Sequence, residues 1–147
     1  MDTSDPRIAI VDDQPSVCLA LARLLRLNGF AVDTYPSGEE FLASLTERIP
    51  SCLILDLQMP GLNGFDVMRR LEAESLPIPI VAITGFDSRS ARERAQSAGA
   101  VVYLPKPVGE EDLLAAIERS TGRRPDQTAK NGSSGARMNQ ISTKEQT

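Results

Sequence analysis

Three carboxylates in this sequence directly follow short apolar segments. Asp12 and Asp13 come after Arg7–Val11, and Asp56 comes after Cys52–Leu55. Both segments are nearly continuous in aliphatic residues, which is typical of strands covered on both faces of a parallel sheet. Because functional groups gather at the carboxyl ends of such strands, we expect these three side chains to converge.

A hydroxyl group and an ammonium group stand at two further predicted strand ends. Thr84–Gly85 follows the apolar segment Ile78–Ile83, and Lys106–Pro107 lies just beyond Val101–Leu104. The remaining predicted strand, Phe30–Tyr35, alternates more strongly, which suits a position nearer the edge of the sheet. It ends without an ionic group, so four strand ends supply the candidate chemistry.

The chemistry follows from the charges at these strand ends. Neighbouring carboxylates repel one another and raise one another's pKa. Lys106 supplies one compensating positive charge, and a hard divalent cation would supply the rest. Mg²⁺ prefers oxygen ligands, commonly one or two carboxylates together with waters and a phosphoryl oxygen. The clustering therefore predicts a site for Mg²⁺, or Mn²⁺, and for an anionic phosphoryl group.

Amphipathic stretches between the predicted strands must position these residues. Val17, Leu21 and Leu25 repeat at helical spacing, and Gly29 follows as a stop signal. Ser88–Ala98 offers only small apolar residues and is expected to be a loosely held helix. Five strands interleaved with five helices predict a doubly wound α/β fold, a parallel sheet with helices on both faces. In the strand order 2-1-3-4-5, the first and third strands would be neighbours and their carboxylates would meet.

Length and composition indicate one folded domain with extensions. The 147 residues are 41% hydrophobic and 24% charged, which is typical of a globular domain. We expect an N-terminal extension over residues 1–5, the domain over residues 6–121, and a disordered C-terminal tail over residues 122–147. The tail is polar and lacks periodicity, so it cannot bury enough apolar surface to become ordered.

Several classes of protein are disfavoured by what the sequence lacks. It contains no histidine, so any phosphohistidine involved must belong to a partner. Residues 1–122 carry eleven basic and eighteen acidic residues, a net charge of −7, which argues against direct DNA binding. No apolar run is long enough to span a membrane, and no targeting signal is recognisable, so a cytoplasmic location is expected. Cys18 and Cys52 lie in apolar stretches and are expected to be buried thiols.

Taken together and in order, these motifs resemble the receiver domains of two-component response regulators. The residues that carry the resemblance are Asp12–Asp13, the run DLQMPGLNG over residues 56–64, Thr84–Gly85 and Lys106–Pro107. The resemblance covers about residues 6–121 and implies a flavodoxin-like (βα)5 fold with strand order 2-1-3-4-5. The runs AITG over residues 82–85 and YLPKP over residues 103–107 are similar to FixJ-type receivers.

The resemblance also assigns roles to individual residues. Asp56 would accept a phosphoryl group from a histidine kinase or a histidine phosphotransferase. Asp13 and Asp56 would bind Mg²⁺ directly, Asp12 would act mainly through water, and the backbone carbonyl of Gln58 would complete the protein ligands. Lys106 would pair with the phosphoryl oxygens. These roles describe a signalling phosphoacceptor rather than an enzyme that turns over a substrate.

The residues around the acceptor would form the pocket and the switch of such a receiver. Gly85 would leave room for the phosphoryl group, and a cis peptide bond before Pro107 would direct the lysine inward. Thr84 would turn to donate to a phosphoryl oxygen, and Tyr103 would act as the aromatic switch. The face formed by the fourth helix, fifth strand and fifth helix would then contact a protein target. A phosphorylation-dependent dimer is left open.

Three readings of the function remain at this point. The first is a stand-alone receiver, and the second is the receiver part of a longer regulator. The third is a pseudo-receiver that binds partners without being phosphorylated, although the complete acidic pair, acceptor, hydroxyl and lysine argue against it. An aspartyl phosphatase would need a second Asp two residues after the nucleophile, where this sequence has Gln58.

Overall fold

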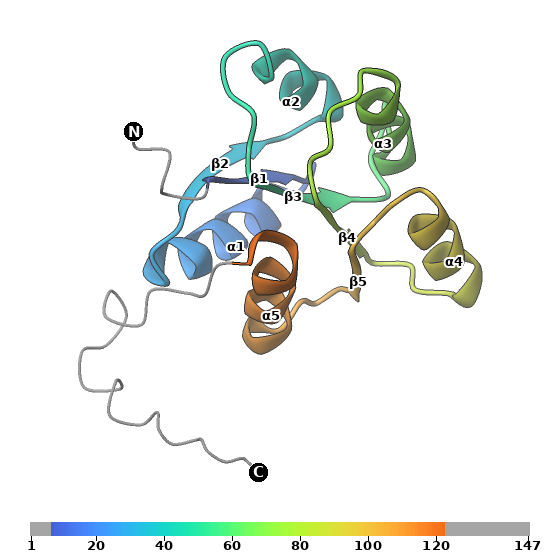
Figure 1. Cartoon of the computed structure of the whole chain (residues 1–147). Coiled ribbons are helices and arrows are strands. Elements are labelled where there is room, and N and C mark those ends of the chain that lie inside the picture. The colour runs from blue at the N-terminus through green and yellow to red at the C-terminus, as the bar shows by residue number, and fades with distance from the viewer. Residues whose placement is uncertain (1–6, 123–147) are drawn as a thin grey trace.

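A computed structural model describes residues 7–122 of the protein. Ten elements alternate along this range (Figure 1). They are β1 (Arg7–Val11), α1 (Pro15–Leu27), β2 (Ala31–Tyr35), α2 (Gly38–Ser44), β3 (Cys52–Asp56), α3 (Gly64–Ala73), β4 (Ile80–Thr84), α4 (Arg89–Ser97), β5 (Val102–Pro105) and α5 (Glu110–Thr121). The predicted alternation of five strands and five helices is confirmed. The expected N-terminal extension and residues 123–147 of the expected tail lie outside the described residues.

All five strands form one parallel sheet in the order β2-β1-β3-β4-β5. The register pairs Val11 of β1 with Leu55 of β3, so the two strands end side by side. It also pairs Asp56 with Ile83 of β4, which places Thr84 one residue beyond the partner of Asp56. The predicted strand order is confirmed. It brings the carboxyl ends of β1, β3, β4 and β5, where the candidate residues lie, to one edge of the sheet.

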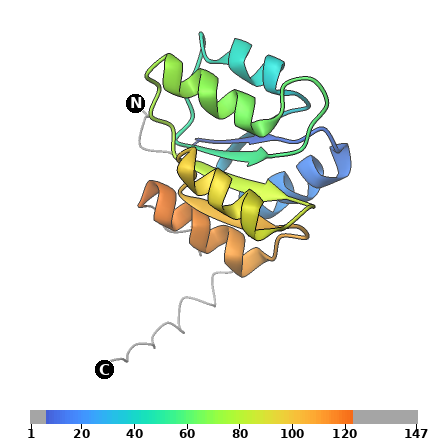
Figure 2. The same ribbon diagram turned by 90° about the vertical axis from the view of Figure 1, so that its right-hand side faces the viewer.

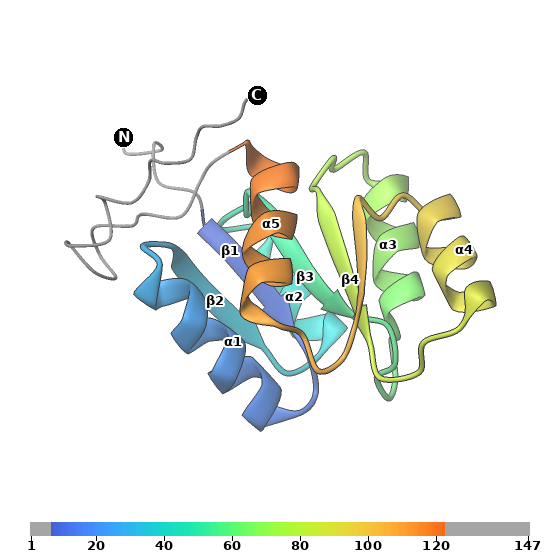
Figure 3. The same cartoon turned by 90° about the horizontal axis from the view of Figure 1, so that it is seen from below.

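Two apolar clusters hold the helices against opposite faces of the sheet. Helices α2, α3 and α4 cover one face, and α1 and α5 cover the other (Figures 1 and 3). The central strands β3 and β4 are buried along their whole length, which explains their continuous aliphatic sequences. Figure 2 shows the same three layers from the side. Within the described residues, no helix is both long enough and apolar enough to cross a lipid bilayer.

The predicted starts of the second, fourth and fifth strands were one or two residues too early, and the predicted ends of the third, fourth and fifth strands were one residue short. Two of the starts have identifiable reasons. The second strand begins at Ala31 rather than Phe30, because the Phe30 N–H donates to Leu25 O and closes the end of α1. The fourth strand begins at Ile80 rather than Ile78, because Pro79 has no N–H to donate to a neighbouring strand. The predicted stop of α1 at Gly29 is confirmed by its positive φ of 91°.

Helix α4 is attached to the sheet by few apolar side chains, as its sequence predicts. Ala95 is its one buried residue. Two arginines on the helix lie over aromatic rings instead, Arg92 at 4.6 Å from the ring centroid of Tyr103 and Arg94 at 3.8 Å from that of Phe65. Cation–π contacts of this kind contribute about 0.5–1 kcal/mol at exposed sites, so α4 is held weakly.

Candidate functional site

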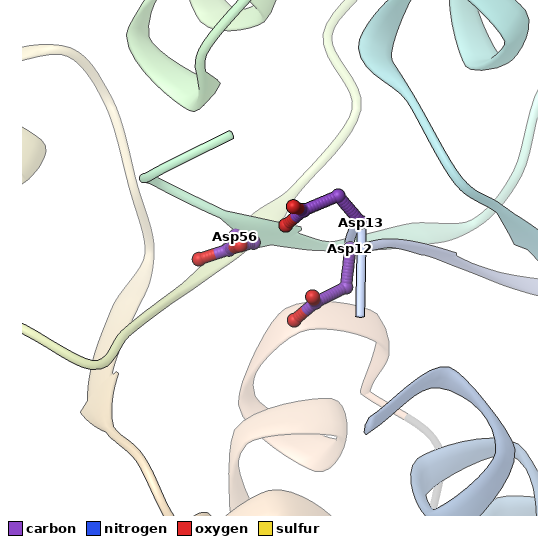
Figure 4. Close-up of side chains that lie close together, drawn as sticks. All are labelled: Asp12, Asp13 and Asp56. Atoms are coloured by element: carbon purple, nitrogen blue, oxygen red, sulfur yellow. The ribbon is translucent and has the colours of Figure 1, made fainter. Parts of the chain in front are cut away.

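The three predicted carboxylates come together at the carboxyl ends of β1 and β3. Asp12 and Asp13 directly follow β1, and Asp56 is the last residue of β3. One oxygen of each carboxylate lies within 4.8 Å of the other two (Figure 4). Asp12 and Asp56 are 1% and 2% exposed, whereas Asp13 is exposed to solvent. The site is therefore a mostly buried acidic cluster with one open side.

Lys106 is the cation that faces this cluster. Its Nζ lies 2.8 Å from Asp12 Oδ2 and 3.6 Å from Asp56 Oδ1, and it donates a hydrogen bond to Gln14 Oε1 at 3.2 Å. The backbone holds the lysine in place, because Lys106 N donates to Thr84 O at 2.7 Å. The predicted cis peptide bond between Lys106 and Pro107 is confirmed. Gln14 was not predicted as a site residue, although it lies only two positions after Asp12.

One lysine does not fully compensate three carboxylates. Burial, followed by the charge of Asp12, raises the pKa of Asp56 from 3.8 to about 6, although Lys106 acts in the opposite direction. Ionising Asp56 in the folded protein is therefore costly. A cation or a hydrogen-bond donor that approaches Asp56 would stabilise the ionised form of its carboxylate.

The residues present fit a hard divalent cation. Asp12 Oδ2 is buried and, apart from its ion pair with Lys106, accepts no hydrogen bond from the described residues. The three carboxylates offer only oxygen donors, and Asp13 opens the cluster to water, which matches the preference of Mg²⁺. The backbone of Gln58 lies beside the Asp56 carboxylate, because its N–H donates to Asp56 Oδ1 at 3.3 Å.

Thr84 and Gly85 lie where the sequence predicts, at the end of β4. Thr84 is completely buried, and its hydroxyl donates to Gln58 Oε1 while accepting from Phe86 N at 2.9 Å. The sequence had assigned only the backbone of Gln58 to the site, so this side-chain contact is new. A Cβ atom added to Gly85 would meet no other atom within 4 Å, so the space beside this residue is open.

Tyr103 is buried in the described structure and is held by two polar residues that were not predicted. Its hydroxyl donates to Asp87 Oδ1 at 3.0 Å, and Arg92 lies over its ring. Burial, followed by the hydrogen bond to Asp87, raises the pKa of Tyr103 above its usual value. Asp87 lies three residues after Thr84, and this short spacing is the sequence signal that could have identified it as part of the site.

The loop that follows Asp56 is fixed by close backbone contact. Asn63 and Asp66 form a reciprocal capping box at the start of α3. A Cβ atom on Gly64 would lie 2.6 Å from Asp56 O and 2.8 Å from Leu57 Cα. Only glycine allows the start of α3 to approach the end of β3 this closely, so Gly64 helps to position Asp56.

A five-stranded parallel α/β fold with an acidic cluster, a lysine and a buried threonine at its strand ends defines the receiver class of signalling domains. The chain belongs to the response regulator receiver domain family, whose model matches residues 8–118. The predicted family is thus confirmed. As a class, receiver domains accept phosphoryl groups in signalling rather than acting as conventional enzymes, and they bind Mg²⁺ at this acidic pocket.

Individual relatives agree with this assignment. The chain is 40% identical over 124 residues to the response regulator MprA of Mycobacterium leprae (strain TN), covering 84% of this chain and 54% of that protein. The crystal structure of FixJ-N is 36% identical with a TM-score of 0.76 and covers 82% of this chain and 97% of the other. A response regulator receiver protein from Burkholderia phymatum is 42% identical with a TM-score of 0.74, covering 82% and 98%. The chain spans about half the length of the curated MprA relatives it matches.

Proposed function

We propose that Asp56 is the phosphoacceptor of this receiver and that a histidine kinase or a histidine phosphotransferase in the cytoplasm is the donor. The observation that carries the proposal is the cluster of Asp12, Asp13 and Asp56 with Lys106 Nζ lying between two of the carboxylates. The proposal concerns the receiver module, and it holds equally for a stand-alone protein and for a module joined to an output domain.

In the transfer step, a carboxylate oxygen of Asp56 attacks the phosphorus of the partner's phosphohistidine. A phosphorus–oxygen bond forms while the phosphorus–nitrogen bond breaks, and the imidazole keeps the electron pair and takes up a proton. Lys106 neutralises charge on the phosphoryl oxygens, for which its position 3.6 Å from Asp56 Oδ1 is suitable. Gly85 leaves the adjacent space open, and Pro107 fixes the lysine's backbone.

Mg²⁺ or Mn²⁺ would be held by Asp13, Asp56 and the Gln58 carbonyl, with Asp12 acting mainly through water. The cation would supply charge neutralisation for the transferring group. The buried Asp12 Oδ2, whose one partner among the described residues is the shared Lys106 ammonium, and the elevated pKa of Asp56 both support a role for this additional positive charge.

The signal would leave the site through Thr84 and Tyr103. Phosphorylation adds a charge of about −1.5 to −2 and strong acceptor oxygens, toward which the Thr84 hydroxyl would turn. The segment after β4 also carries Asp87, the hydrogen-bond partner of Tyr103. We propose that rearrangement here changes the face formed by α4, β5 and α5, which would bind a protein target. The weak attachment of α4 supports its role as the moving element.

Incubation with acetyl phosphate and Mg²⁺, followed by intact-protein mass spectrometry, tests the proposal. The parent should gain the mass of one phosphoryl group, and hydroxylamine should remove it because the product is an acyl phosphate. Asp56→Asn should gain none, whereas Glu47→Gln, which changes an exposed carboxylate away from the site, should behave like the parent. A parent that gains no mass under these conditions would identify the pseudo-receiver instead.

A further inference from the structure

The proton of the Thr84 hydroxyl group is already used in a hydrogen bond in the structure. It is buried, donates its proton to Gln58 Oε1 and accepts the N–H of Phe86 at 2.9 Å. A hydroxyl group has one proton to donate. While Thr84 donates this proton to Gln58 Oε1, it cannot donate a hydrogen bond to a phosphoryl oxygen.

We infer that the Gln58 side chain is a positioning residue that restrains Thr84 in the unphosphorylated state. It competes with the phosphoryl group for the single hydroxyl proton of Thr84. This inference rests on the proposed function, because it assumes that Thr84 turns toward a phosphoryl group on Asp56. It gives the side chain of Gln58 a role separate from that of its backbone carbonyl.

The position of Gln58 suits this role. Its backbone is anchored beside the acceptor, since its N–H donates to Asp56 Oδ1. Its side chain crosses to β4, whose Ile83 pairs with Asp56 in the sheet. Gln58 also borders a surface hollow of about 500 Å³, so the released carboxamide has a solvent-accessible space to enter. Breaking the contact therefore does not require the core to be repacked.

The size of the restraint follows from the hydrogen bond that must be exchanged. One neutral hydrogen bond contributes a net free energy that corresponds to roughly a two- to tenfold change in an equilibrium constant. A ligand that needs the released form of Thr84 therefore binds more weakly by this factor than it would without Gln58. Leu at position 58 would retain much of the bulk but could not accept the proton.

Beryllofluoride, a tetrahedral analogue of a phosphoryl group, provides an equilibrium test. We expect Gln58→Leu to bind beryllofluoride about two- to tenfold more tightly than the parent by calorimetry at saturating Mg²⁺. Gln58→Met provides a second variant if the first folds poorly. Gln96→Leu, the same chemical change at an exposed position on α4, should match the parent. Titration with Mg²⁺ alone would correct for any change in cation affinity.

A double-mutant cycle distinguishes the restraint from a general effect on the site. In a Thr84→Ala background no hydroxyl proton remains, so replacing Gln58 should leave the affinity for beryllofluoride unchanged. The inference is overturned by an unchanged or weaker affinity of Gln58→Leu in the parent background. An equal gain in the Thr84→Ala background would also overturn it.

A second measurement does not depend on metal or phosphoryl binding. In metal-free protein, three-bond couplings by NMR should report one dominant χ1 rotamer of Thr84 in the parent and averaging in Gln58→Leu. Averaging in both proteins, or one rotamer in both, would overturn the inference. If the parent fails to bind beryllofluoride at all, the proposed function fails, whereas the restraint is still decided by these couplings.

Discussion

Replacing Asp56 by Asn should stabilise the metal-free protein at neutral and alkaline pH, although it removes the proposed functional group. Asn retains nearly the same shape but cannot be ionised. The carboxylate of Asp56 is buried and lies close to Asp12, and both factors raise its pKa from 3.8 to about 6. The parent therefore ionises this group at a cost in the folded state that the Asn variant avoids.

The magnitude follows from the pKa difference. Each pKa unit corresponds to about 1.36 kcal/mol, so the increase from 3.8 to about 6 sets an upper limit of about 3 kcal/mol. Between these two values the folded state holds more protons than the unfolded state, and stability falls as pH rises. The advantage of Asp56→Asn should therefore be fully present above about pH 6 and should disappear as the pH approaches 4.

Urea unfolding in buffer containing a chelator, at intervals from pH 4 to pH 8, would measure this effect. Glu47→Gln provides the control, because it makes the same change from carboxylate to amide at an exposed position. That variant should follow the parent at every pH. An Asp56→Asn variant that is no more stable than the parent at pH 8, or whose advantage does not change with pH, would refute the electrostatic account of the site.

Two further predictions concern the surroundings of the acceptor. Gly64→Ala should lower the free energy of unfolding by about 1–3 kcal/mol, because its Cβ would overlap the backbone at the end of β3. Gly85→Ala, where a Cβ meets nothing within 4 Å, should leave the urea midpoint unchanged, and equal losses would contradict the steric argument. Tyr103→Phe should cost about 1 kcal/mol by losing the hydrogen bond to Asp87. In the same unfolding assay, the double variant Tyr103→Phe/Asp87→Ala should lose less free energy of unfolding than the sum of the losses of the two single variants, and full additivity would disprove their coupling.

The sequence predicted the fold and the location of the site because both depend on patterns with a short period. Continuous aliphatic segments identify buried parallel strands, and the residue after each segment must lie at one edge of the sheet. The strand pattern alone predicts that Asp12, Asp56 and Lys106 lie together, and the distances confirm their convergence. Strand starts were less predictable, because Phe30 is apolar yet its N–H is used by the end of α1.

The contacts between side chains could not be read from the sequence. Gln58 and Thr84 are 26 residues apart, and their hydrogen bond depends on the pairing of β3 with β4 and on a rotamer choice. The contact of Gln14 with Lys106 spans 92 residues. Polar residues at such positions are compatible with many partners, so spacing alone does not identify which partner each one binds.

The segment over residues 84–87 connects the acidic site to the start of α4. Thr84 accepts the N–H of Phe86, and the next residue, Asp87, accepts the hydroxyl proton of Tyr103. A rotation of the Thr84 hydroxyl would therefore alter its contact with the Phe86 N–H. Phe86 directly precedes Asp87, whose carboxylate accepts the hydrogen bond from Tyr103. The same ring lies beneath Arg92 of α4, a helix with a single buried side chain. Because each of these hydrogen bonds and cation–π contacts is worth only about 1–3 kcal/mol, the phosphoryl charge proposed on Asp56 would be large enough to rearrange them.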